Sequence, residues 1–395
     1  MISETRVIGI DHMALYTPSQ YLDLSDLAAA RGVDVAKYLV GIGIREAAIA
    51  QANEDPVVLA LNAGHRVLAE ANVDPEDVGM LIVGTESAVD KSKPIATHVH
   101  ELLQIGAACR VYDVVHACIG GTYGVLSALD WLQNEKNQYA LVIATDIARY
   151  GKNNLGEPTQ GAGAVALLLS RNPRLMALEE ISVYSQQVWD FWKPLDEVYP
   201  VVDGMYSAQC YIEAALACFA SAEPVNPDWA FAYHTPYPKL IQQVHARVIR
   251  QADGDIKWQN HFAENVAPSC ELASKIGNIY TGSLWLAVIS LLESWCENPA
   301  VRKEQSYMFS YGSGSGAALL MGQLQVSWQQ MAGKFRTKEF LDQRKKITIT
   351  DYENSIRDYE ALPPIEGMSA PAGSNFMLEA IRDKKRVYAI TKQVN

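Results

Sequence analysis

One stretch, VVHACIGGTYGVL from Val114 to Leu126, limits the possible folds of this chain more than any other. Two β-branched residues lead into a turn of small residues, and Cys118 stands where a helix is expected to begin. The first backbone N–H groups of a helix lack internal partners and lie at the positive end of its dipole, so we expect a lowered pKa for the Cys118 thiol. Gly120 and Gly121 would let a substrate approach the backbone closely. The pattern predicts a strand-to-helix elbow with a reactive thiol, although a cysteine in an apolar run is more often inert packing.

Length and composition narrow the classes of protein. The 395 residues suggest about two domains or one duplicated domain, and 49% hydrophobic residues provide a substantial core. The formal charge of −12 argues against nucleic-acid binding. The six cysteines are scattered without a CxxC pair, which gives no metal-binding spacing and indicates a reduced, cytoplasmic chain. The sequence has no signal-peptide pattern and no run of about 18 apolar residues, so we expect no membrane insertion.

The first half alternates strands and helices, and polar residues fall at the strand ends. A buried strand over 80–83 ends in Gly84-Thr85-Glu86-Ser87, which places Glu86 at its exit. Asp55 is expected to cap a helix that begins at Pro56. The other expected elements are strands over 6–15, 110–115, 139–144 and 164–169, helices over 23–39 and 95–103, and a glycine-rich turn over 158–163.

The second half repeats this layout in weaker form. A strand over 228–233 ends at His234, a helix over 240–249 follows, and the segment 277–283 opens a further apolar helix. A hairpin is expected from strands over 305–311 and 317–324, and a closing edge strand over 387–395. Residues 171–225 are aromatic and irregular, which fits either interdomain packing or a substrate-facing wall containing Asp203, Ser207 and Gln209. We therefore predict a duplicated α/β architecture with halves 1–170 and 171–395, and an active site where they meet.

Seven motifs occur in an order that resembles a known family. They are GTES (84–87), ACIGGT (117–122), ATDIARYG (144–151), EPTQGAGAVALLL (157–169), YHTPYPKL (233–240), GNIYTGSLWL (277–286) and FSYGSGSGA (309–317). Together they resemble the bacterial type of hydroxymethylglutaryl-CoA synthase, in the thiolase superfamily. The resemblance implies a thiolase-like fold, with two duplicated mixed-sheet halves in a layered αβαβα arrangement. It also implies condensation of acetyl-CoA with acetoacetyl-CoA in the mevalonate pathway.

The resemblance assigns three catalytic roles. Cys118 matches the nucleophile that takes the acetyl group as a thioester, Glu86 matches the acid/base that removes a methyl proton, and His234 matches the residue that polarises the ketone of acetoacetyl-CoA. The chemistry needs such a set, because capture on a thiol separates acyl transfer from carbon–carbon bond formation. Burial would raise the pKa of Glu86 toward neutrality. The Cys118 N–H and the backbone of the YGSGS loop are candidate donors to the oxyanion.

Substrate contacts follow from the same resemblance. Asn278 and Ser313 match polar groups near the thioester, whereas Thr159, Ser207 and Lys239 match positions that contact the hydroxymethylglutaryl group or CoA. Asp34 begins a segment, 34–37, near the CoA mouth. The resemblance implies a homodimer and neither a metal nor a redox cofactor, since the CoA thioesters are substrates. From the residues alone, Glu86 could be a solvated cap, His234 could satisfy a backbone carbonyl and Asn278 could cap a helix.

Departures from the family pattern keep alternatives open. His116 and Ile119 replace the glutamate and aromatic residue that commonly flank the nucleophile, and Gln243 replaces a lysine that meets CoA phosphates in some relatives. Weakened phosphate contacts would suit a synthase that acts on acyl carrier proteins in polyketide β-branching. A thiolase or ketoacyl synthase is disfavoured by Glu86. A non-catalytic thiolase-fold scaffold that binds acyl-CoA is disfavoured by the complete set of Cys118, Glu86 and His234.

Overall fold

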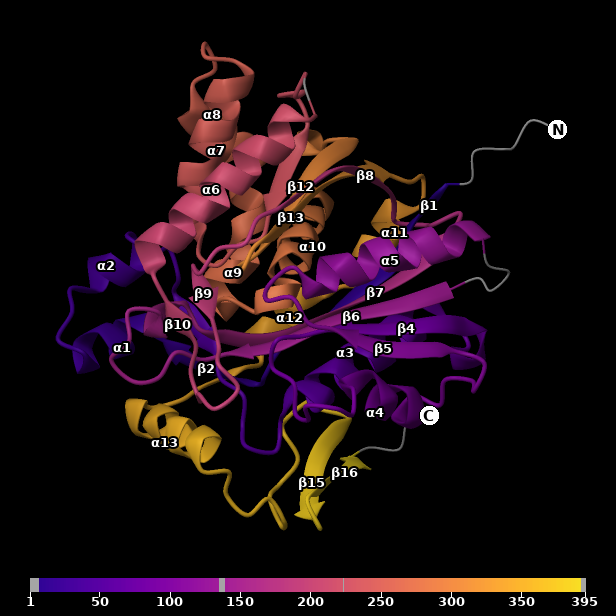
Figure 1. Cartoon of the computed structure of the whole chain (residues 1–395), viewed down its shortest axis with the longest axis vertical. Helices are drawn as coiled ribbons and strands as arrows, with labels where there is room; N and C mark the ends of the chain where they lie inside the picture. The colour runs from indigo at the N-terminus through magenta and orange to yellow at the C-terminus, as the bar shows by residue number, and fades with distance from the viewer. Residues whose placement is uncertain (1–6, 135–138, 223, 392–395) are drawn as a thin grey trace.

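A nine-stranded mixed sheet runs through the computed structural model, which describes residues 7–134, 139–222 and 224–391 (Figure 1). The strand order is β11-β12-β13-β8-β1-β7-β6-β4-β5. Five strands come from the first half: β1 (Ile8–Tyr16), β4 (Val78–Gly84), β5 (Arg110–Val114), β6 (Tyr139–Ala148) and β7 (Gly161–Arg171). Four come from the second: β8 (Met176–Ser185), β11 (Ala230–Tyr233), β12 (Gln305–Gly312) and β13 (Gly316–Leu324).

The two halves of the sheet share one pairing pattern, which confirms the expected duplication. In the first half β1 is antiparallel to β7, β7 is antiparallel to β6, and β6 is parallel to β4. In the second half β8, β13, β12 and β11 repeat these relations in the same order. The halves join where β1 pairs with β8 at Gly9 and Ala177. A Cβ at Gly9 would lie 2.1 Å from the Met176 carbonyl oxygen, so the close approach at this seam requires glycine.

Three hydrophobic clusters establish the layers. One face of the first-half sheet packs against α3 (Pro56–Ala71) and α4 (Ile95–Leu102). The opposite face packs with one face of the second-half sheet around α5 (Gly120–Asn134) and α10 (Ser283–Glu297). The remaining face of the second-half sheet carries α6 (Gly204–Ala220), α7 (Pro238–Ala252) and α8 (Trp258–Asn265). This is the αβαβα arrangement predicted above, with α3 and α6 in opposite outer layers (Figure 1).

Several expected elements are confirmed, and others need correction. Asp55 caps α3 by accepting from the backbone N–H groups of Val57 and Val58, both at 3.1 Å. The helix expected over 23–39 is two short helices, α1 (Leu24–Ala30) and α2 (Val35–Leu39). The break follows the αR C-cap at Arg31, Gly32 with a positive φ, and Asp34, which caps the second helix. The second half of the expected glycine-rich turn is strand, because β7 begins at Gly161.

The middle of the chain is more regular than expected. Residues 171–225 contain β8 and the 17-residue helix α6, besides the short strands β9 (Phe191–Trp192) and β10 (Val201–Val202). Asp203 caps α6 by accepting from the Tyr206 N–H, and the helix buries Cys210, Tyr211 and Ala214 against the second-half sheet. The predicted boundary at 170/171 falls at the end of β7.

The chain beyond residue 325 returns to the first half. Its elements are α11 (Trp328–Ala332), α12 (Thr337–Asp342), β14 (Lys345–Lys346), α13 (Ile349–Glu360), β15 (Phe376–Arg382) and β16 (Lys385–Ile390). The expected closing strand forms β16 but pairs with β15 in a separate sheet, and residues 392–395 lie outside the described part. The remaining elements are β2 (Gln20–Asp23), β3 (Glu46–Ala48) and α9 (Glu271–Ile276).

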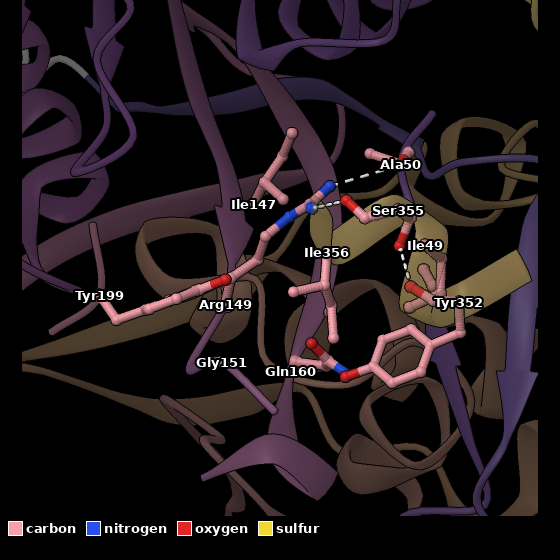
Figure 2. Close-up of a pocket in the computed structure, with 13 residues that line it drawn as sticks. Ile49, Ala50, Ile147, Arg149, Gly151, Gln160, Tyr199, Tyr352, Ser355 and Ile356 are labelled. Atoms are coloured by element: carbon pink, nitrogen blue, oxygen red, sulfur yellow. Dashed lines mark hydrogen bonds between the residues drawn. The ribbon is translucent and has the colours of Figure 1, made fainter. Parts of the chain in front are cut away.

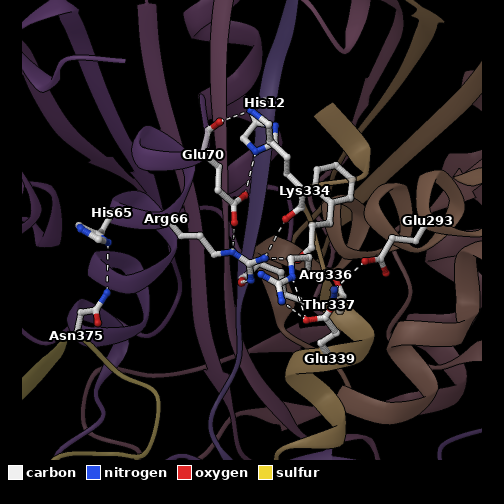
Figure 3. A network of polar contacts seen from close by, with 12 residues as sticks. His12, His65, Arg66, Glu70, Glu293, Lys334, Arg336, Thr337, Glu339 and Asn375 are labelled. Atoms are coloured by element: carbon white, nitrogen blue, oxygen red, sulfur yellow. Dashed lines mark hydrogen bonds and ion pairs between the residues drawn. The ribbon is translucent and has the colours of Figure 1, made fainter. Parts of the chain in front are cut away.

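A polar network fastens this returning segment to β1 and α3 (Figure 3). Glu70 accepts from Arg66 Nε at 2.6 Å and lies 3.0 Å from His12 Nε2. Lys334 Nζ donates to the Glu70 carbonyl oxygen at 2.6 Å. None of the helices within the described residues is both long and apolar enough to cross a membrane.

Candidate active site

Cys118 lies in a tight turn between β5 and α5. Ala117, just before it, has a φ of +37°, a strained conformation for a residue with a Cβ. The turn is closed by the Ile119 N–H, which donates to the His116 carbonyl at 3.1 Å. α5 then begins at Gly120, two residues after Cys118. The predicted strand-to-helix elbow is therefore present, with the thiol just before the helix.

Glu86 meets this thiol directly. It follows the exit of β4, as predicted, and its Oε1 accepts a hydrogen bond from Cys118 Sγ at 3.3 Å. Burial raises the pKa of the Glu86 carboxyl, and the negative charge of Asp146 adds to this effect. The expectation that desolvation raises the pKa of Glu86 is confirmed. Two groups 32 residues apart in sequence thus form one acid–base pair.

The expectation of a lowered pKa for Cys118 is wrong. Burial raises the pKa of its thiol well above the usual value, and the charges of Glu86, Asp146 and Asp190 raise it further. The positive end of α5 is outweighed, because three carboxylates and a low-polarity surrounding all disfavour a thiolate. Cys118 is therefore a neutral thiol that donates its hydrogen bond to Glu86.

Asp146 organises the loop that carries Glu86, and the sequence reasoning did not single it out. Its Oδ1 accepts from the Glu86 N–H at 2.9 Å and from Ser87 Oγ at 2.8 Å. Its Oδ2 accepts from the N–H and Oγ of Thr281, at 3.1 and 2.6 Å, across the junction of the halves. Asp146 is fully buried, which the motif ATDIARYG does not reveal on its own.

His234 occupies the exit of β11, as predicted. Its N–H donates to the Phe309 carbonyl at 2.7 Å, and its own carbonyl accepts from the Tyr211 hydroxyl at 2.7 Å. The Tyr211 ring stacks on the imidazole with centroids 6.2 Å apart. Burial lowers the pKa of His234 to about 3, so its ring is neutral at neutral pH. Its Nδ1 has no hydrogen-bond partner among the described residues.

Asp190 joins the aromatic middle segment to the GSGSG turn, and it was also missed. This fully buried carboxylate accepts from Ser207 Oγ at 3.1 Å, from the Tyr311 hydroxyl at 2.9 Å and from the Gly314 N–H at 3.0 Å. Ser207, a predicted substrate contact, therefore donates to Asp190 here. Ser313, also predicted, lies half-exposed in the turn that Asp190 holds.

Asn278 and Thr159 lie side by side at the junction of the halves. The Asn278 N–H donates to the Thr159 carbonyl at 2.9 Å. The Asn278 side-chain oxygen accepts from the Tyr280 N–H at 2.9 Å and from Ser283 Oγ at 2.8 Å, and these bonds order the turn before α10. Thr159 Oγ1 donates to the Gly156 carbonyl at 2.8 Å.

Lys239 and Asp34 lie away from the thiol. Lys239 is the second residue of α7, where its N–H donates to the Ile42 carbonyl at 3.0 Å and its Nζ donates to Gln242 at 3.0 Å. Asp34 accepts from the Ala36 N–H at 2.9 Å, so its side chain caps α2. The described residues show no contact between either side chain and Cys118, which fits a rim rather than a reaction centre.

The two unusual neighbours of the nucleophile bring no charge to it. Burial lowers the pKa of His116, whose ring lies 5.3 Å from that of Tyr123, so a neutral imidazole replaces the usual carboxylate. Ile119 is fully buried in the central core. Within the described residues, His, Cys, Asp and Glu side chains form no group of three or more that could hold a metal ion.

Comparisons with known proteins agree on one family. The model of the hydroxymethylglutaryl-coenzyme A synthase N-terminal region matches residues 4–173, and that of its C-terminal region matches residues 178–254 and 255–363. The hydroxymethylglutaryl-CoA synthase of Enterococcus faecalis is 37% identical over 88% of this chain and 90% of its own length. The hydroxymethylglutaryl-CoA synthase of Gibberella zeae is 31% identical over 89% of this chain and 90% of its own length. The solved structure of MvaS in complex with 3-hydroxy-3-methylglutaryl coenzyme A has a TM-score of 0.90 and 36% identity, covering 98% of this chain and all of that one.

Proposed function

Because the chain belongs to the hydroxymethylglutaryl-CoA synthase family and is the acyltransferase that condenses acetyl-CoA with acetoacetyl-CoA (EC 2.3.3.10), we propose that Cys118, Glu86 and His234 perform this reaction. The observation that carries the proposal is the 3.3 Å hydrogen bond from the Cys118 thiol to Glu86. It supplies a nucleophile together with the base that activates it.

In the first step the acetyl group moves to Cys118. As sulfur attacks the thioester carbon of acetyl-CoA, Glu86 takes the thiol proton and passes it to the departing CoA thiolate. A thiol with a raised pKa needs such a base at the moment of attack, since little thiolate exists beforehand. The Cys118 N–H and the turn holding Ser313 would stabilise the oxyanion.

In the second step Glu86 removes a proton from the acetyl methyl group. Its raised pKa suits this task, because a stronger base abstracts the proton more readily. The carbanion attacks the ketone of acetoacetyl-CoA, which neutral His234 polarises through a ring N–H. The proton held by Glu86 returns to the alkoxide. Tyr211 and the Phe309 carbonyl would fix the position of His234 during this step.

In the last step water hydrolyses the Cys118 thioester and releases hydroxymethylglutaryl-CoA. Asn278, Ser313, Thr159 and Ser207 would position the acyl groups, and Lys239 with the segment that begins at Asp34 would border the CoA mouth. The MvaS structure in complex with 3-hydroxy-3-methylglutaryl coenzyme A supports binding of this product by a chain of the same fold.

The expected assembly is a homodimer in the cytoplasm. The edge strand β5 supports a homodimer, because among the described residues this strand pairs with β4 alone and runs into the elbow, where Val115 is 70% exposed. Size-exclusion chromatography with light scattering would measure the mass in solution.

The test replaces each of the three proposed catalytic residues in turn. Cys118→Ala should abolish covalent acetylation by radiolabelled acetyl-CoA. Glu86→Gln should lose condensation by at least about a hundredfold. His234→Ala should mainly impair use of acetoacetyl-CoA. Label retained on Cys118→Ala, or normal condensation by Glu86→Gln, would contradict the assigned roles. An acetoacetyl carrier protein offered in parallel to acetoacetyl-CoA tests the carrier-protein alternative.

A further inference from the structure

A cavity of about 250 Å³ lies beside Glu86 and belongs to none of the roles above. Its lining includes Glu54, Asp55, Arg149, Lys193, Asp358 and Arg386 besides Glu86. Neither Cys118 nor His234 lines it, and none of the residues predicted to contact CoA or the acyl groups does so. Glu86 is thus reached from a second direction.

The wall of this cavity combines the first half with the returning C-terminal segment. Arg386 of β16 donates to Asp55 at 2.9 Å, and the Tyr388 hydroxyl donates to the same carboxylate at 2.8 Å. Arg149 donates to the carbonyl oxygens of Ser355 and Ala50, at 2.8 and 3.3 Å, and so holds α13 in place. Figure 2 shows both bonds in a different pocket, which also has Arg149 and Ser355 in its lining. The cavity is therefore bounded by hydrogen-bonded segments.

A smaller hollow of about 20 Å³ shares Glu86, Arg149 and Lys193 with the larger cavity. Phe191 and Tyr280 line it together with Glu86 and Lys193. The Phe191 and Tyr280 rings lie 5.9 Å apart, and Tyr280 belongs to a small cluster against which both Phe191 and Cys118 pack. Glu86 therefore lines both spaces, and its carboxylate accepts the 3.3 Å hydrogen bond from the Cys118 thiol.

The chemistry requires such a second route, an argument that rests on the proposed function. In hydrolysis Glu86 takes one proton of water while the oxygen adds to the thioester carbon. The carbon–sulfur bond then breaks, and the Cys118 sulfur takes that proton back. The new carboxylic acid ionises at neutral pH, so each turnover consumes one water and releases one proton. At this stage the CoA group of the second substrate is still part of the covalent adduct. It therefore still fills the opening through which CoA thioesters enter, the CoA mouth.

Glu54 gives the cavity a second proton-carrying group. Its side chain is fully buried and accepts from the Tyr16 hydroxyl at 2.7 Å. Burial raises the pKa of Glu54 to about 7, so it can take up or release a proton near neutrality. Asp55, in contrast, is engaged by Arg386 and Tyr388.

We propose that this cavity is the route by which the hydrolytic water reaches Glu86 and the product proton leaves, with Glu54 as an intermediate proton carrier. The substrate mouth then serves the CoA thioesters, and the cavity walled by α13 and β16 serves water and protons.

The test fills the cavity from two opposite walls. Ala52→Leu adds bulk from the loop before α3, and Leu362→Trp adds it from the segment after α13, where Leu362 is 44% exposed and tolerates a larger ring. Ala222→Leu is the matched control, because Ala222 is also partly buried. It packs against the cluster formed by α6, α7 and α8 and does not line the cavity. Acid-quench single turnovers would measure acetylation, accumulation of the covalent hydroxymethylglutaryl adduct and product release.

We expect both filling variants to acetylate Cys118 at the unmodified rate but to hydrolyse the adduct at least about tenfold more slowly, so that the adduct accumulates. Glu54→Gln, which keeps the shape of the side chain, should slow the same step. Unchanged hydrolysis in both filling variants would overturn the inference. An equal loss of acetylation and hydrolysis would overturn it too, since that indicates general distortion. If the unmodified chain forms no acetyl-Cys118, the proposed function fails instead.

Discussion

Replacing Gly84 by alanine should separate Glu86, the proposed base, from Cys118, the proposed nucleophile, without changing either residue. Gly84 is the last residue of β4, two positions before Glu86. A Cβ on Gly84 would lie 2.4 Å from both the Cα and the N of Gly121, at the start of α5. Backbone atoms cannot change rotamer as the end of a side chain can. The strand β4 and the helix α5 must therefore separate by about 1 Å before the new Cβ reaches an ordinary van der Waals distance. The Cys118–Glu86 hydrogen bond at 3.3 Å spans this junction.

The magnitude follows from this displacement. A shift of about 1 Å between reacting groups costs roughly a hundredfold in rate, and overpacking of this kind costs about 1–3 kcal/mol in the free energy of unfolding. Gly124→Ala is the control, because its Cβ would meet only side-chain atoms of Ile82 and Val142, at 3.1 Å. Steady-state condensation and urea unfolding would measure both effects. If Gly84→Ala matches Gly124→Ala within twofold in rate, the close approach does not position Glu86.

Two further substitutions probe electrostatics and stability. Asp146→Asn removes a negative charge that raises the pKa of Glu86, so Glu86 should ionise at lower pH. The rising limb of the pH–rate profile for condensation should therefore move by about one pH unit toward acid. A move toward alkaline pH would refute this sign. Asp55→Ala removes the cap of α3 together with the partner of Arg386 and Tyr388. It should lower the free energy of unfolding by about 2–4 kcal/mol, as measured by urea titration. Asp55→Asn still caps the helix, so it should lower the free energy of unfolding by less. Equal stability of Asp55→Ala and the unmodified chain would show that the cap and ion pair contribute nothing.

The local signals in the sequence were sufficient for most of the sheet and for the elbow. Short apolar runs flanked by turn residues predicted the strands. Asp55-Pro56 predicted the start of α3, because helix capping depends on a few adjacent residues. The sequence also predicted correctly that Glu86 and His234 follow the ends of two strands, which are β4 and β11. The helix α6 was missed because its aromatic and cysteine content hides the apolar periodicity, and because it is stabilised by packing on the second-half sheet.

The state of the thiol could not be predicted from local sequence. The position of Cys118 near a helix start favours a thiolate, but the opposing effects of Glu86, Asp146 and Asp190 come from residues 28 to 72 positions away. Asp146 and Asp190 themselves look ordinary in sequence, since their importance lies in how many donors they gather once the strands are assembled. Electrostatics of this kind is a property of the assembled site.

The duplication explains why the site lies between the halves. Each half has a glycine-rich segment before a buried helix, but only the first carries a nucleophile. In the second, the segment before α10 places Thr281 so that its N–H and hydroxyl bind the Asp146 carboxylate and its hydroxyl also lies 3.0 Å from the Gly84 carbonyl. Asn278 from the same segment binds the Thr159 backbone. One copy of the elbow therefore presents the thiol, while its counterpart holds the strand end and the carboxylate that position the base.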